Sequence, residues 1–85
     1  MTTLLIVLQV VAGAALAKVG AAIGSSIIVL GASYGISKIG ASALDSMARQ
    51  PEAAGDIRSG MVVSAALIEG VSFFAIIICA LIILL

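Results

Sequence analysis

The stretch Met61–Leu85 reads MVVSAALIEGVSFFAIIICALIILL and decides the fold of this chain. As an α-helix it is long enough to cross the roughly 30 Å hydrocarbon core of a bilayer. Its single ionisable side chain is Glu69. An ionised carboxylate near the middle of a bilayer costs at least about 3 kcal/mol. We therefore expect Glu69 to be mostly neutral there and to release its proton only where water or a cation reaches it. The alternative is a protonated Glu69 that only hydrogen-bonds helices together.

The composition predicts a membrane protein. The chain has 85 residues, of which 64% are hydrophobic, with four acidic and four basic side chains. A soluble domain of this size cannot bury so much apolar surface. The chain has neither the basic cluster nor the aromatic platform that nucleic acid binding needs. It has no histidine, and its lone Cys79 has no partner for a disulfide or a metal. We therefore expect no catalytic residue, no metal site and no bound cofactor.

The N-terminal segment Met1–Ala17 is apolar and has no basic residue before Leu4. A secretory signal needs a positively charged start. We therefore assign the segment to the first helix. The triplet Ala15-Leu16-Ala17 resembles a cleavage site, so processing stays open as an alternative.

The apolar stretch from about residue 4 to residue 44 is too long for one simple crossing. Its outer end is expected to project beyond the membrane or to bend. Five of its glycines follow one another at steps of seven, four, seven and four, which return to nearly the same helix face. Small residues on one face let helix backbones approach closely in lipid. These helix-packing glycines are Gly13, Gly20, Gly24, Gly31 and Gly35.

Part of this stretch carries small residues at every other position: Gly31, Ser33, Gly35 and Ser37. Each two-residue step turns a helix by about 200°, so these residues line two opposite flanks. A helix of this kind fits tightly between two copies of itself. The pattern predicts a homo-oligomeric ring with the first helix on its crowded inner circle.

A polar island at residues 45–58 separates the two apolar stretches, and Pro51 lies within it. Proline breaks a preceding helix and is well suited to start the next. The fold class is therefore an all-α transmembrane hairpin over residues 1–85. We expect a first helix at about 4–46, a turn at about 47–52 and a second helix at about 53–84. Counting back from the turn places Glu69 opposite residues 32–36.

Basic residues gather around the turn, where Arg49 and Arg58 flank the island and Lys38 lies just before it. The positive-inside rule puts this turn in the cytoplasm and both termini outside. We expect Lys38 and Lys18 to extend toward lipid headgroups.

Two segments resemble a known family. They are Ala48–Ala53, which reads ARQPEA, and Ala65–Gly70, which reads AALIEG. Together they look like the c-subunit of the rotary F-type ATP synthases, and the resemblance covers nearly the whole chain. It implies a multi-pass subunit of a ring in a bacterial inner membrane, in contact with lipid and without an ATP-hydrolysing site of its own.

The resemblance also implies roles for individual residues. Glu69 would bind and release the transported ion, meeting an essential arginine on the a-subunit as the ring turns. The family's polar turn contacts the central-stalk subunits gamma and epsilon, and here it consists of Arg49, Gln50 and Pro51.

The resemblance favours protons over sodium as the transported ion. Sodium-binding members carry Gln, Ser or Thr, and Tyr where this chain has Ile36, Gly70 and Phe74. A sodium ion needs several oxygen ligands, whereas a proton needs one carboxylate and an acceptor. A sodium version of the ring stays open because serines lie nearby. The expected neighbours of the site are Ser33, Ile36, Ala66, Gly70 and Phe74.

One other class of function is compatible with these residues. A small homo-oligomeric channel, like a holin pore, would line its lumen with Glu69. Such a pore conducts ions by itself, whereas a rotor ring is sealed and needs the a-subunit. A small multidrug-type transporter is a poorer match, because this chain has too few membrane spans.

Overall fold

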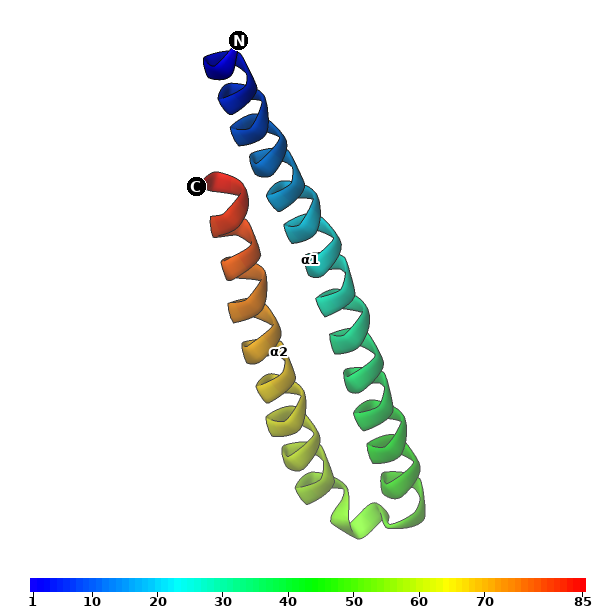
Figure 1. Ribbon diagram of the computed structural model, residues 1–85. Helices are drawn as coiled ribbons and strands as arrows, with labels where there is room; N and C mark the ends of the chain where they lie inside the picture. Colours follow the sequence, from blue (N-terminus) through cyan, green and yellow to red (C-terminus); the bar gives the residue numbers. More distant parts are fainter.

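The computed structural model describes residues 1–85 and consists almost entirely of two antiparallel helices (Figure 1). Helix α1 spans Thr2–Arg49, the short 3-10 helix η1 spans Pro51–Ala53, and helix α2 spans Ala54–Leu84. Both long helices have the length and apolar composition needed to cross a membrane. The predicted all-helical hairpin is confirmed.

The hairpin turns at a proline, for a local reason. Gln50 leaves the helical conformation, with φ −131° and ψ 72°, because a residue that precedes proline is disfavoured in the α region. Its N–H still donates to the carbonyl of Ser46 at 2.9 Å and closes the last turn of α1. Pro51 then opens η1, where its missing N–H costs nothing. Helix α1 thus continues past residue 46 before the chain reverses.

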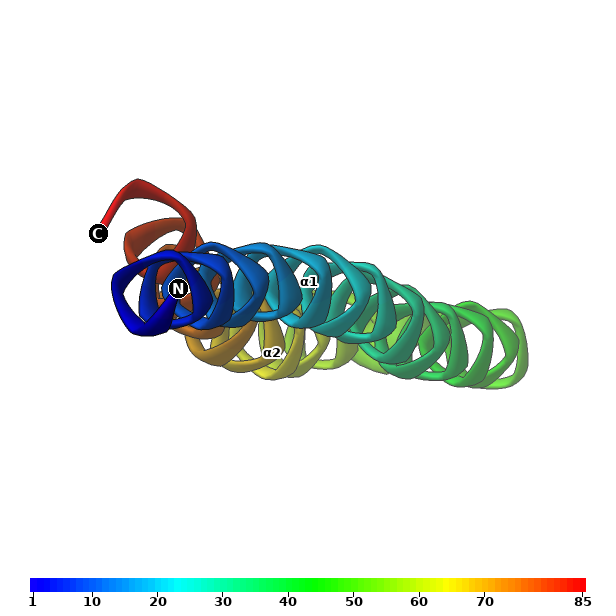
Figure 2. The ribbon, with the colours of Figure 1, turned by 45° about the horizontal axis from the view of Figure 1, so that its top comes forward.

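The two helices lie side by side along most of α2 (Figures 1 and 2). A Cβ atom added at Gly35 would lie 3.1 Å from Cδ1 of Ile68, and one added at Gly24 would lie 3.8 Å from Sγ of Cys79. These two glycines therefore allow α1 to approach α2 of its own chain. The other three, Gly13, Gly20 and Gly31, have no such neighbour within 4 Å.

The hairpin has almost no core of its own. Only Ala21 and Ala43 are buried, and no residue of α2 is. Large apolar side chains along both helices are exposed in the single chain. In a membrane, lipid or other copies of the chain must cover this surface.

Helix α1 is much the longer of the two, and its N-terminal end projects past the C-terminus of α2 (Figure 1). The molecule is 75 Å long, more than twice the roughly 30 Å thickness of a bilayer core. The outer end of α1 therefore projects beyond the end of α2, as expected from the sequence. Every residue before Ala21 is exposed.

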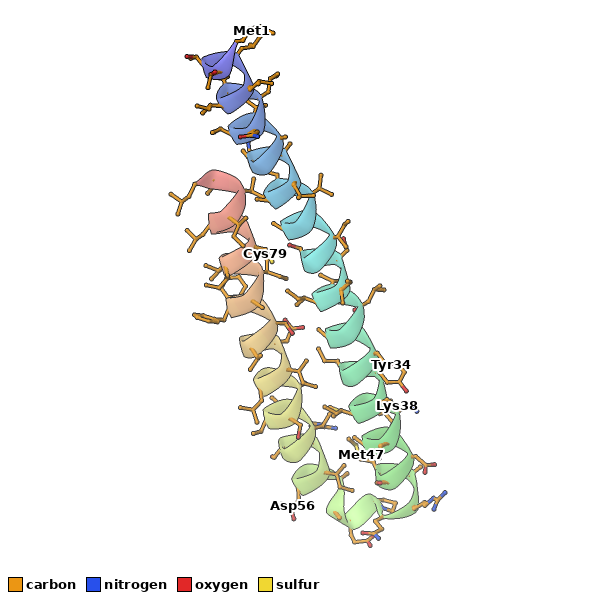
Figure 3. All side chains as sticks on the ribbon, viewed as in Figure 1. Met1, Tyr34, Lys38, Met47, Asp56 and Cys79 are labelled. Atoms are coloured by element: carbon orange, nitrogen blue, oxygen red, sulfur yellow. The ribbon has the colours of Figure 1, made fainter.

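Polar side chains along the helices are accommodated locally. The hydroxyls of Ser25, Ser26 and Ser59 donate to carbonyls four residues earlier, at 2.8 to 3.1 Å. Such bonds reduce the cost of placing a hydroxyl in lipid. Lys38 extends along α1 beside Tyr34, with its Nζ 5.5 Å from the ring centroid (Figure 3). The tyrosine face attracts the ammonium group.

Candidate functional site

Glu69 lies near the middle of α2, where it lines a pocket of about 300 Å³ between the two helices. Helix α1 contributes Ala32, Ser33 and Ile36 to the same pocket. The structure therefore has the register that counting back from Pro51 predicted. It arises because both helices rise equally per residue from a short turn.

The rest of the pocket is apolar apart from one further hydroxyl. Ser72 stands one turn after Glu69, beside Phe73 and Ile76, and Val29 completes the lining. Neither Ser33 nor Ser72 forms a hydrogen bond within the chain. Both hydroxyls are thus free of partners within the chain and lie in the lining of the pocket that Glu69 shares. Sequence reasoning missed Ser72, although residues three apart on a helix share a face, and that spacing could have found it.

Other expected neighbours do not enter this pocket. Ala66, Gly70 and Phe74 are exposed and lie outside it. Ile36 does line it, and its side chain offers no oxygen where sodium-type relatives have a glutamine. No lysine or arginine lines the pocket, so a charged Glu69 has no cation beside it there.

The polar turn occupies the closed end of the hairpin, with Arg49, Gln50 and Pro51 all exposed. Arg49 forms an ion pair with Asp45, its Nη2 lying 3.2 Å from Oδ2. A pair this exposed contributes at most about 1 kcal/mol to stability. It therefore leaves the guanidinium free to change partners.

Most of the chain matches a family of known proteins. Residues 19–82 match the model of the family described as the C-subunit of ATP synthase. This segment is well over half of the chain and includes both the turn and Glu69. The chain belongs to the ATP synthase c-subunit family.

Relatives named as ATP synthase c-subunits match over most of their length. One from Phocaeicola vulgatus is 58% identical over 78 residues, covering 92% of this chain and 93% of the relative. One from Bacteroides thetaiotaomicron is 53% identical over 78 residues, covering 91% and 92%. One from Azobacteroides pseudotrichonymphae is 55% identical over 74 residues, covering 87% and 90%.

These matches confirm the resemblance to the c-subunit that the turn and the second helix carry. They also confirm the rotor-ring role in F-type ATP synthase, and they support a bacterial membrane protein. The ion that the ring transports and the roles of single residues stay predictions.

Proposed function

We propose that this chain is a proton-carrying subunit of the ATP synthase rotor ring, with Glu69 as the carrier. The observation behind this proposal is the pocket of Glu69. Glu69, the only ionisable side chain of the apolar stretch Met61–Leu85, lies near the middle of α2 and shares a pocket with two free hydroxyls and otherwise apolar groups. In the apolar interior of a bilayer the neutral form of a carboxyl group costs less than the charged form, and either serine has an oxygen that can accept a hydrogen bond from it.

The proposed mechanism is a cycle in the protonation of Glu69. The neutral side chain faces lipid at low cost, so the ring turns freely with the acid protonated. The charged form is tolerated only near a cation and water, which the a-subunit would supply with its arginine and its two aqueous half-channels. Entry and exit of the proton on opposite sides of the membrane then bias the rotation.

The exposed turn suits contact with the central stalk. Arg49 can exchange its weak pair with Asp45 for a partner on the gamma or epsilon subunit. The proposed topology places this turn in the cytoplasm and both termini outside. The concentration of Arg49 and Arg58 around the turn supports it, since only Lys18 lies toward the open end.

The two flanks of α1 give the ring a head-to-tail contact. Gly31 and Ser33 are two residues apart, so they point about 200° away from each other. Ser33 lines the Glu69 pocket on one side of the contact between α1 and α2, and Gly31 lies on the other side, with no atom of the chain within 4 Å of a Cβ added there. A ring repeats one such heterologous contact until it closes. The flank of α1 that carries Gly31, here called the glycine flank, would then cover the flank of the next copy that carries Ser33 and the Glu69 pocket.

Protons fit this pocket better than sodium. The side chains supply the Glu69 carboxylate and the hydroxyls of Ser33 and Ser72. Hard cations such as Ca²⁺ collect about six to eight oxygens. A proton needs one acceptor, and either serine provides it.

A hydrophobic carbodiimide tests the carrier role, because it reacts with protonated carboxyl groups. We expect it to modify Glu69 selectively, because Glu69 lies within the apolar stretch of α2 whereas the other three carboxyl groups lie in the polar turn. Labelling should fall as the pH rises and Glu69 loses its proton. Sodium at millimolar concentration should give no protection. The measurement is the labelling rate at each pH, located by mass spectrometry of the modified chain.

The matched control replaces sodium with potassium at the same ionic strength. Protection by sodium alone would overturn the proton assignment and point to ligands beyond the three side chains of the pocket. Equal modification of Asp45, Glu52 and Asp56 would show that Glu69 is no better protonated than the carboxylates of the turn.

A further inference from the structure

We infer that Ser72 is a positioning residue for the proton carrier. Its hydroxyl hydrogen-bonds the carboxyl group of Glu69 and holds it in the pocket between α1 and α2. The inference rests on the carrier role proposed above for Glu69. It adds the group that keeps the carboxyl away from lipid between one proton transfer and the next.

Ser72 and Glu69 are brought together by the helix that carries both. Residues three apart on a helix share a face, with about 5–6 Å between their Cβ atoms. Helical side chains lean toward the N-terminus of their helix, so the hydroxyl of Ser72 leans over the turn that carries Glu69. Both residues line the pocket of about 300 Å³. Their spacing is set within α2 and does not depend on how α1 packs.

Ser72 also lies at the contact between the two helices. It lines the Glu69 pocket on one side of this contact and a pocket with Gly31 and Leu67 on the other side. Ala32 of α1 is the one other residue that lines both pockets. Ser72 is half-buried there. Helix α1 therefore restricts the position of its hydroxyl, which is what a positioning group needs.

The hydroxyl of Ser72 has no partner in the backbone. Three other serines donate to carbonyls of their own helix, whereas Ser72 forms no hydrogen bond within the chain. A hydroxyl left without a partner in apolar surroundings costs free energy. The other polar side chains of the pocket are Glu69 and Ser33. A bond to the carboxyl group of Glu69 would remove this cost.

A hydroxyl suits a carboxyl group that gains and loses a proton. It accepts a hydrogen bond from the O–H of the neutral acid, and it donates one to the carboxylate. Ser72 can therefore hold Glu69 both before and after the proton leaves. An apolar residue at this position would hold neither form.

Ser33 is a poorer anchor for the carboxyl group. It comes from α1, so its distance from Glu69 depends on the packing of the two helices, and its side chain is exposed. No ionisable group other than Glu69 lines the pocket. Lys38 and Tyr34 lie outside it and face each other along α1, with Nζ 5.5 Å from the ring centroid (Figure 3). No charge in the pocket therefore competes with Ser72 for the carboxyl group.

Labelling by the hydrophobic carbodiimide measures this anchor in the complete ATP synthase. The rate is taken at a pH low enough that it no longer changes with pH, where every Glu69 is protonated. In Ser72→Ala we expect the rate to rise about fivefold, because the neutral acid no longer has to break a hydrogen bond before it meets the reagent in lipid. Ser72→Thr keeps the hydroxyl and should label at the parent rate.

Ser64→Ala is the matched control, because it removes a free hydroxyl of α2 that lies outside the Glu69 pocket. This variant should also label at the parent rate. Alanine is a better helix former than serine, so a weakened helix cannot explain a faster reaction in Ser72→Ala.

An infrared spectrum gives a signature that a purely structural role of Ser72 would not change. The C=O stretch of protonated Glu69 is isolated by subtracting the spectrum of Glu69→Gln rings from that of the parent. A carboxyl group engaged in a hydrogen bond absorbs at lower frequency than a free one. We therefore expect the band to move to higher frequency in Ser72→Ala and to stay in place in Ser72→Thr.

The parent labelling rate and an unshifted band in Ser72→Ala would overturn the inference. A faster rate and a shifted band in Ser33→Ala alone would overturn it as well, and would give the anchor to α1. In both cases the carrier role of Glu69 stands as long as its labelling still depends on pH. A parent ring whose Glu69 is not labelled at any pH would remove the carrier role and the anchor together.

Discussion

We expect Glu69→Gln to abolish both ATP-driven proton pumping and proton-driven ATP synthesis, while the ring still assembles. Glutamine keeps the shape and the hydrogen-bonding capacity of the neutral acid beside Ser33 and Ser72, but it cannot release a proton. The ring is therefore expected to form without a carrier. Pumping in inverted vesicles and ring size on native gels are the two measurements.

Asp56→Asn is the matched control, because it removes a carboxylate at the exposed start of α2 (Figure 3). This variant should pump at the parent rate. Parent rates in Glu69→Gln would show that another group carries the ion. Loss of the ring in Glu69→Gln would instead give the carboxyl group a structural role, as the alternative interpretation of the sequence held.

We expect Gly31→Leu to prevent ring formation while the hairpin itself still folds and inserts. No atom of the same chain lies within 4 Å of a Cβ added there. The added Cβ therefore meets no obstacle within the hairpin, where Gly31 lines an open pocket of about 450 Å³ with Leu67 and Ile68 of α2. This space can accept a leucine, so we expect the collision to be with an adjacent copy. Leucine is also a better helix former than glycine by about 1 kcal/mol, so a weakened helix cannot explain the loss. The measurement is the yield of rings on native gels, relative to total chain in the membrane.

Gly24→Leu should also block the ring, but there the side chain additionally meets Cys79 of the same hairpin. Gly55→Leu is the control, since Gly55 is equally open and lies at the start of α2, away from the glycine flank. It should leave the ring yield unchanged. Rings of normal size and yield from Gly31→Leu would show that this flank faces something other than a neighbouring copy.

The hairpin and its register could be predicted from sequence because few quantities determine them. The length of Met61–Leu85, the position of Pro51 and the constant rise of a helix place Glu69 opposite residues 32–36. No side-chain packing enters that argument. It therefore holds even in a molecule without a core.

The sequence alone did not settle which helix each glycine of α1 contacts or which side chains line the pocket, because both depend on how each helix is rotated about its axis. Glycine spacing predicts close approach, but it does not say to which helix. The structure places Gly24 and Gly35 against α2 and leaves Gly31 open. Ser72 was not predicted, because the positions where sodium-type relatives carry ligands lie elsewhere on α2. Its spacing of three residues from Glu69 could have found it, and the structure places it in the lining of the same pocket.

Burial of only two side chains, Ala21 and Ala43, has a genetic consequence. The surface that the single hairpin leaves exposed is available to its own copies in the ring, so one altered codon changes every contact between copies around the circle at once. A loss of about 0.6 kcal/mol, typical of one polar contact between membrane helices, is repeated as many times as there are copies. A cell that makes both normal and Glu69→Gln chains assembles mixed circles. If Glu69 carries the proton as proposed, one altered copy is expected to halt the whole circle, and the defect should be dominant over the normal gene.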